Sequence, residues 1–244
     1  MCKREPSEWL EQCGLSTALQ NFIAQDPEVR SGILSFLQVA AKWTSKSAIL
    51  VDLGAGSSPF RELFDVAQYI AVDWNENAPS APFRIDVQAS ADNVPLPDGV
   101  ADVIIITELL EHSPSPVETL REARRLMKPG ARMFGTTPFA WEFHEMPHDY
   151  FRYTPSAITS LCHQVGLQVI SIEERGSTLD VLKVLGRKIA YAFRDDSRLE
   201  MQASIATLSE AIDTIHKLGR EASATHQGFP LGLSFVAARP MEKE

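Results

Sequence analysis

Cysteine is scarce in this chain of 244 residues, which contains only Cys2, Cys13 and Cys162. An odd number of thiols cannot pair completely, and their spacing matches no metal-ligand pattern. The sequence therefore argues against a disulfide framework and favours a reduced, cytoplasmic setting.

Positive charge is also in short supply, with 23 lysines and arginines against 32 acidic residues and no basic cluster. Binding to a nucleic-acid backbone depends on cationic side chains that release counterions, so a nucleic-acid partner is not expected. Long apolar runs are missing too, since none approaches the ~18 residues that a membrane span needs. The first residues are too polar and acidic for a signal peptide, so we expect no membrane insertion.

Short apolar runs and helical patterns alternate from residue 48 onward, which predicts a doubly wound, Rossmann-like α/β sheet. In such a sheet, ligands bind beyond the carboxyl ends of the strands. We expect strands over 48–52, 68–73, 83–86, 100–107, 132–137, 167–173 and 231–238, helices over 115–128 and 155–165, and a short helix from Pro59.

Helical sequence precedes this core and also interrupts it before the last strand. Two helices end near Trp43, and Asp26 is expected to cap the second, with Pro27 in its first position. The expected organisation is one domain over 1–244, with a helical cap over 1–47, an α/β core over 48–177, a helical insertion over 178–226, and a closing strand and tail over 227–244.

The helical insertion carries apolar residues in steps of four and three, the spacing of a heptad seam. The pattern is formed by Met201, Ile205, Leu208, Ile212 and Ile215. It predicts either a helix that covers its own domain or a surface for a homodimer or another partner, formed by the 178–220 region. His216 on the same stretch has no evident partner in the sequence.

The first expected strand ends in a glycine-containing loop with Gly54 and Gly56. Glycines permit a tight turn and close approach to a ligand, and free N–H groups at the following helix can bind a carboxylate. Pro59 stands where the dinucleotide fingerprint has its third glycine, which counts against a nicotinamide cofactor. Asp73 ends the second strand, where its carboxylate can accept hydrogen bonds from ribose hydroxyls. Trp74 follows and either flanks an adenine or packs half-buried.

Five blocks in order resemble the class I S-adenosylmethionine (SAM)-dependent methyltransferases, and more narrowly their methyltransferase type 11 branch. The blocks are 51–56, 72–73, 94–102, 108–112 and 126–131, and the resemblance extends over about 48–175. It implies SAM as the cofactor and a seven-stranded sheet, mostly parallel, with its last strand antiparallel. The cofactor residues that it implies are Asp52, Gly54, Ala55, Gly56, Asp73, Trp74, Ser90, Ala91 and Thr107.

A polar block over 144–155 follows the fifth strand, where the mouth of the active site is expected. One interpretation is that His144 or His148 deprotonates the acceptor, because imidazole titrates near neutral pH. Another is that Arg152 and Asp149 pair and hold a lid loop in place. A metal bound by His144 and His148 would suit one helix face, but the proline between them disfavours a helix, so no metal is expected.

Glu108 and His112 follow the fourth strand, which is another usual position for site residues in this fold. We expect Glu108 beside the SAM sulfonium or the acceptor, and His112 is a catalytic candidate or a structural residue.

The acceptor is suggested only by resemblance. The 144–155 block, together with 56–64, is similar to bacterial methyltransferases of polysaccharide and natural-product sugar gene clusters, so a sugar or glycan hydroxyl is expected. One alternative is a quinone-like or other lipophilic acceptor under an apolar lid formed by Trp9, Phe22 and Phe36. The other is a non-catalytic SAM-binding regulatory protein that acts through the 199–218 helix.

Overall fold

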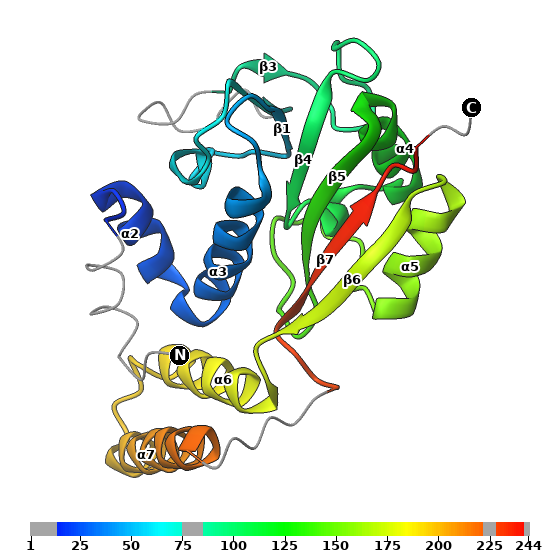
Figure 1. Ribbon diagram of the computed structural model, residues 1–244. Helices are drawn as coiled ribbons and strands as arrows, with labels where there is room; N and C mark the ends of the chain where they lie inside the picture. The colour runs from blue at the N-terminus through cyan, green and yellow to red at the C-terminus, as the bar shows by residue number, and fades with distance from the viewer. Residues whose placement is uncertain (1–13, 75–84, 222–227, 242–244) are drawn as a thin grey trace.

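The computed structural model describes residues 14–74, 85–221 and 228–241 (Figure 1). Cys2, Cys13, Trp9 and the first half of the third expected strand lie outside these residues. In chain order the elements are α2 (Thr17–Gln25), α3 (Pro27–Trp43), β1 (Ile49–Leu53), the 3₁₀ turn η1 (Arg61–Leu63), β2 (Gln68–Asp73), β3 (Val87–Gln88), β4 (Ala101–Thr107), the 3₁₀ turn η2 (Leu110–His112), α4 (Pro116–Leu126), β5 (Met127–Pro138), α5 (Pro155–Gln164), β6 (Gln168–Arg175), α6 (Thr178–Ala192), α7 (Leu199–Glu221) and β7 (Gly232–Ala238).

The strands form one sheet in the order β3-β2-β1-β4-β5-β7-β6. β1 to β5 pair in parallel, and β7 is antiparallel to both of its neighbours. The predicted Rossmann-like sheet of seven strands with a reversed last strand is therefore confirmed.

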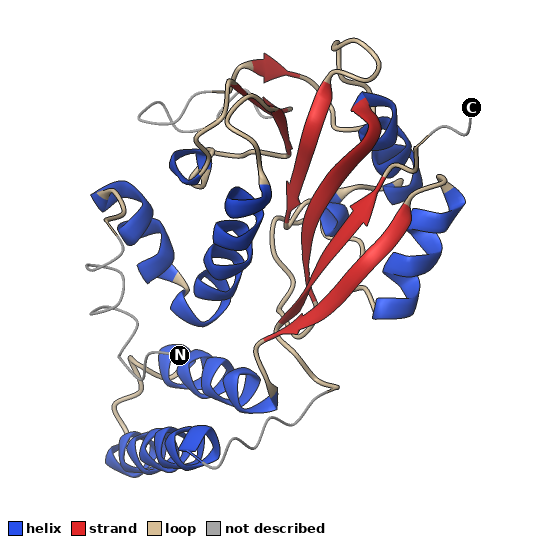
Figure 2. Cartoon of the chain, in the orientation of Figure 1, coloured by secondary structure: helices blue, strands red, loops and turns tan. Residues whose placement is uncertain are grey.

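Helices cover both faces of the sheet (Figure 2). Along β1, Leu50 packs in the layer formed with α2 and α3, whereas Val51 and Leu53 pack in the opposite layer, which α4 and α5 complete. Successive side chains of a strand point to opposite faces, so burial on both faces requires the continuous apolar run that the sequence shows.

Two elements differ from the sequence prediction. β3 lies at Val87–Gln88 rather than 83–86, as a two-residue strand at the sheet edge. β5 begins at Met127 rather than at 132 and continues through Pro129, which lacks an N–H group. An irregular register with β4 accommodates the proline, and the N–H of Gly130 donates to the carbonyl of Arg239 at 2.9 Å.

Ion pairs connect α6, in the helical insertion, to the start of α3. Asp26 precedes α3 as expected, but its side chain makes no cap hydrogen bond; it accepts one from Arg187 of α6 at 2.8 Å. Arg187 also donates to Glu28 at 2.8 Å, so one guanidinium holds the start of α3. The predicted cap interaction is therefore wrong, because the carboxylate has a charged partner in α6.

α7 packs against α6, and the two lie together below the sheet in Figure 1. The approach is close at Gly186, where a Cβ would lie 2.4 Å from Cδ1 of Ile212. Nε2 of His216 donates a hydrogen bond to Oδ1 of Asp180 at 2.9 Å, so the structure supplies a partner that was not evident in the sequence. Of the heptad residues, Ile212 is buried, whereas Leu208 and Ile215 are 39% and 48% exposed.

The two phenylalanines of the expected apolar lid pack inside the molecule. Phe22 meets Phe60 edge-on with ring centroids 5.5 Å apart, and Phe36 meets Phe134 at 6.0 Å. Both belong to the layer between α3 and the sheet. None of the helices in the described residues combines the length and the hydropathy that a membrane crossing needs.

Candidate active site

In the sheet, β2 and β3 lie on one side of β1, and β4 and β5 lie on the other, so the strand order reverses between β1 and β4. Ligands bind at such a reversal, and the expected ligand position is therefore the crevice beyond the carboxyl ends of these two strands. Gly54 has φ +70°, and a Cβ there would lie 2.6 Å from Cδ1 of Leu109, so only glycine suits both the turn and the contact. Gly56 has φ +52° and faces open space, which leaves room for a ligand beside the loop.

Asp73 lies at the end of β2 and is only 8% exposed. Its Oδ2 accepts a hydrogen bond from the N–H of Gly56 at 2.8 Å, which fixes the carboxylate beside the glycine loop. Trp74 follows with 63% of its surface exposed. The N–H of Ala89 donates to the carbonyl of Asp73 at 3.0 Å, so the chain reaches Ser90 and Ala91 next to the same strand end.

These residues fit SAM. The turn at Gly54 and Gly56 leaves space for a ligand, Asp73 places a carboxylate where ribose hydroxyls can donate to it, and the exposed ring of Trp74 offers a flat apolar face. Ala55 is buried within the loop, and Thr107 is the last residue of β4 on the far side of the crevice.

Asp52 is placed differently from the other predicted cofactor residues. It is 3% exposed, and its Oδ2 accepts a hydrogen bond from the hydroxyl of Tyr69 at 2.6 Å, between β1 and β2. Its Oδ1 has no partner among the residues that the structure describes. Burial raises the pKa of Asp52 to about 7. The side chain thus lies inside the α2–α3 layer, below the loop.

Backbone strain gathers in the loops around the crevice. Ser58, Glu108 and Glu145 have φ values of +49°, +49° and +50°, and they are the non-glycine residues with positive φ in the described parts of the chain. Each such conformation costs about 1 kcal/mol or more and is found most often at functional sites.

Glu108 follows β4 and is paired with a buried arginine. Its Oε1 accepts a hydrogen bond from Arg175 Nη2 at 2.6 Å, and Arg175 is 6% exposed. The same guanidinium also donates to the carbonyls of Thr137 and Leu233 at 3.1 and 3.3 Å. The sequence prediction did not include Arg175. It could have been noticed as a charged residue at the carboxyl end of a strand, where ligands bind in this fold.

Glu111 is a second residue that the sequence prediction left out of the site. Its side chain is fully buried, and neither carboxylate oxygen accepts a hydrogen bond from another residue that the structure describes. Burial, followed by the nearby charge of Glu108, raises the pKa of Glu111 well above its ordinary value. The nearest imidazole nitrogen is Nε2 of His112, 3.8 Å from Oε1.

The structure brings two predicted catalytic histidines together. The rings of His112 and His144 meet edge to face, with centroids 4.7 Å apart. Nδ1 of His112 lies 2.7 Å from the carbonyl of His148, and Nδ1 of His144 lies 3.2 Å from the carbonyl of Glu142. A carbonyl oxygen only accepts, so both Nδ1 atoms carry hydrogen, and each neutral ring keeps its lone pair on Nε2.

His148 turns towards the cofactor side of the crevice instead. Its exposed ring meets Trp74 edge-on with centroids 5.6 Å apart, and its Nδ1 lies 3.2 Å from the hydroxyl of Tyr150. His144 and His148 therefore have different neighbours although they lie on the same loop. We call the segment over 139–153 the mouth loop.

An ion pair holds the mouth loop in place, as one interpretation of the sequence predicted. Arg152 donates to both carboxylate oxygens of Asp149, at 2.6 and 3.0 Å, and to the carbonyl of Glu142 at 2.8 Å. The Arg152 guanidinium holds the pKa of Asp149 well below its usual range. Asp149 also accepts from the N–H of His144 at 3.0 Å, so the pair fixes the backbone that carries this histidine.

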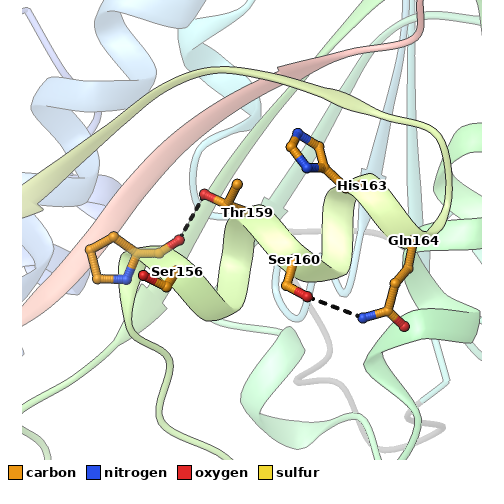
Figure 3. Close-up of a pocket in the computed structure, with 6 residues that line it drawn as sticks. Ser156, Thr159, Ser160, His163 and Gln164 are labelled. Carbon is orange, nitrogen blue, oxygen red and sulfur yellow. Dashed lines mark hydrogen bonds between the residues drawn. The ribbon is translucent and has the colours of Figure 1, made fainter.

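A separate depression lies along the solvent face of α5 (Figure 3). Its hydrogen bonds are local, from Thr159 to the carbonyl of Pro155 at 2.9 Å and from Gln164 to Ser160 at 3.4 Å. It shares no residue with the glycine loop or the mouth loop, and His163 is its only titratable side chain. We assign the chemistry to the crevice at β1 and β4.

A family model described as a methyltransferase domain matches residues 26–172. The ubiquinone biosynthesis O-methyltransferase of Pseudomonas aeruginosa is 27% identical over 139 residues, which cover 50% of this chain and 55% of the relative. The chain thus spans about half the length of the curated relatives it matches.

Solved structures share the fold at low identity. A SAM-dependent methyltransferase from Archaeoglobus fulgidus superposes with a TM-score of 0.57 and 21% identity, covering 89% of this chain and 97% of that chain. The [4+2]-cyclase SpnF gives a TM-score of 0.57 with 16% identity, covering 86% of this chain and 81% of that chain. Fold alone therefore does not define the reaction, and the site residues must do so.

Proposed function

Because the chain belongs to the family of class I SAM-dependent methyltransferases, we propose that it methylates a hydroxyl oxygen of a small molecule, with a sugar as the preferred acceptor. The observation that carries this proposal is the position of the His148 ring beside Trp74, with the paired rings of His112 and His144 close by. An oxygen acceptor must lose its proton, and imidazole is the side chain best suited to take it near neutral pH.

The cofactor and the protein chain have different roles in the proposed reaction. When bound, SAM supplies the methyl group, whose bond to sulfur breaks as the bond to the acceptor oxygen forms, leaving S-adenosylhomocysteine. The chain aligns the two reactants across the crevice and removes the hydroxyl proton. We assign proton removal to His148, whose exposed ring contacts Trp74 on the cofactor side. His112 and His144, beside Glu111, lie next to the proposed position of the acceptor hydroxyl.

The surroundings of the mouth favour a polar ring over a lipophilic tail. Phe143 and Tyr150 are 85% and 43% exposed on the mouth loop, next to the exposed carboxylate of Glu145. Flat apolar faces beside hydrogen-bond acceptors match a sugar, which has C–H faces and hydroxyl edges. Phe22 and Phe36 are packed against the sheet, so they do not supply the apolar lid that a lipophilic acceptor would use.

A phenolic hydroxyl is the second candidate, supported by the name of the Pseudomonas relative. The two acceptors can be separated with radiolabelled SAM and a panel of nucleotide sugars, glycans, catechols and hydroquinones. We expect labelled sugar product, a kcat about 100-fold lower for His148→Ala, and unchanged activity for His163→Ala on the exposed face of α5. Label in phenols alone would contradict the sugar assignment, and label in no acceptor would contradict O-methylation.

Cofactor binding is measured separately by calorimetry. Asp73→Ala removes the carboxylate at the end of β2, and we expect SAM to bind at least about tenfold more weakly. His148→Ala should bind SAM as the parent does, because its effect is on the proton of the acceptor. Equal SAM affinity for Asp73→Ala and the parent would contradict the position of the ribose.

We also propose that the chain forms a homodimer through the exposed face of α7. Leu208, Ile215 and Leu218 are 39%, 48% and 57% exposed there, while Ile212 is covered by α6. Burial of such side chains between two copies would stabilise a dimer. Light scattering should give twice the mass of the chain for the parent and the single mass for Ile215→Glu. The same mass for both proteins would contradict the proposal.

A further inference from the structure

We propose that Glu111, His112 and His144 bind a divalent transition-metal ion at the mouth of the crevice. One ligand atom from each residue lies within 4.8 Å of the other two. The first two residues come from the turn after β4, and the third comes from the mouth loop. From the sequence we expected no metal, because Pro147 disfavours a helix that would bring His144 and His148 together; in the fold these two rings have different neighbours.

Glu111 provides the first argument. Its carboxylate is fully buried, and neither oxygen has a hydrogen-bond partner among the described residues. The two neighbouring guanidiniums donate no hydrogen bond to it, since Arg175 is bound to Glu108 and Arg152 is bound to Asp149. A buried carboxylate without a donor is costly, and an ion is one of the few groups that can satisfy both oxygens.

The orientation of the two imidazoles is the second argument. Each ring donates through Nδ1 to a backbone carbonyl, which aims the Nε2 lone pair away from that carbonyl. Histidines that bind metals are held in this way, with the other ring nitrogen donating to a carbonyl or a carboxylate. His144 has both kinds of acceptor, because Nδ1 also lies 3.5 Å from Oδ2 of Asp149.

The spacing suits an ion better than a direct contact. Nε2 of His112 is 3.8 Å from Oε1 of Glu111 and 3.8 Å from Oε2 of Glu145, which is too long for a hydrogen bond. Ligands at ~2.1 Å from a shared ion lie roughly 3 to 3.5 Å apart, so the cluster needs only a small contraction. Glu145 is on the exposed mouth loop and can approach as a further ligand.

The ligand set selects the class of ion. Two imidazole nitrogens and one carboxylate suit Zn²⁺, Co²⁺ or Fe²⁺, whereas Mg²⁺ prefers oxygen ligands. Three protein ligands leave positions open, as in catalytic rather than structural zinc sites. In its functional part the inference rests on the proposed function: an ion here would bind the acceptor oxygen and lower the pKa of the hydroxyl before His148 takes its proton.

The test uses the full chain, treated with a chelator, desalted, and titrated with ZnCl₂ by calorimetry and with CoCl₂ by visible absorption. We expect one equivalent of either ion per chain. Glu111→Gln and His144→Ala should weaken binding at least about tenfold, whereas His163→Ala on α5 is the matched control and should bind as the parent does. Circular dichroism checks the fold, and His144→Ala on the surface loop decides the outcome if Glu111→Gln does not fold.

Three results would overturn the site: no stoichiometric binding, equal affinity for His144→Ala and the parent, or tighter binding of Mg²⁺ than of Zn²⁺. The titrations need neither SAM nor an acceptor, so they decide the site even if the acceptor assignment fails. Methyl transfer by stripped and Zn²⁺-loaded protein is then compared on the acceptor that the panel identifies. Equal rates would overturn the role of the ion in the reaction and leave the binding site standing.

Discussion

The fold buries the carboxyl group of Asp52 between β1 and β2. Replacing Asp52 with asparagine measures how this burial changes the free energy of unfolding with pH. Only one of its oxygens is hydrogen-bonded, to Tyr69, among the residues described, and burial raises its pKa from an ordinary 3.8 to about 7. The folded chain therefore holds this proton at pH values where the unfolded chain has already lost it. The stability that the group contributes is complete below about pH 4 and is lost as the pH rises to about 7.

The size of the effect follows from the two pKa values. A rise of the pKa from 3.8 to about 7 lowers the free energy of unfolding by about 4 kcal/mol once the pH is above both values. This follows because each pKa unit corresponds to about 1.4 kcal/mol. Most of this loss, about 3 kcal/mol, falls between pH 5 and pH 8. Asp52→Asn keeps the shape of the side chain and an acceptor for Tyr69 but cannot ionise, so the variant should escape this loss.

The assay is urea unfolding followed by circular dichroism at intervals between pH 5 and pH 8. The informative quantity is the free energy of unfolding of Asp52→Asn minus that of the parent, because groups common to both proteins cancel. We expect this difference to grow by about 3 kcal/mol towards pH 8. Asp195→Asn, with its carboxyl 85% exposed, is the matched control and should show a flat difference. A flat difference for Asp52→Asn as well would refute the reasoning.

Three further substitutions and one chemical treatment follow from the geometry. Gly54→Ala puts a methyl group against Leu109 at φ +70° and should lower the midpoint of thermal unfolding, whereas Gly56→Ala meets open space and should mainly weaken SAM binding by calorimetry. Arg175→Met should lower the free energy of unfolding by about 3 kcal/mol in urea titrations, because it leaves a buried ion pair broken; a change under about 1 kcal/mol would contradict this. Burial raises the pKa of the Cys162 thiol to about 12, so this thiol should react with Ellman's reagent only after denaturant is added, and rapid reaction of the native thiol would contradict its burial.

The sheet could be read from the sequence because each central strand carries its own signal. β2 was predicted over the residues that form it, since the apolar run of 69–72 lies between the polar residues Gln68 and Asp73. β3 was misplaced because a two-residue edge strand has no apolar run to detect. β5 extends through Pro129 because tertiary pairing with the segment after β7 overrides the local stop signal.

Site residues could be predicted from the sequence only where the motif that identifies them lies within one short segment. Gly54, Gly56 and Asp73 were found in this way, and the structure places them together. Glu111 was left out of the predicted catalytic set and Arg175 was missed, because their importance lies in burial and in contacts made by distant segments. Spacing along the sequence also did not reveal that the ring next to His144 is that of His112, because this neighbour comes from the turn after β4.

The position of β7 has a consequence for the order in which the chain can assemble during synthesis. Within the described sheet β6 is an edge strand whose only neighbour is β7, and the whole of α6 and α7 is made between them. The ribosome must therefore release residues 232–238 before β6 gains a hydrogen-bonded neighbour. The hydrogen bonds of Arg175 are also incomplete until residues 232–238 have been made, because the carbonyl of Leu233 is one of its acceptors. The hydrogen bonds that hold the Arg175 guanidinium beside Glu108 are thus completed by nearly the last residues described, after the described helices have been made.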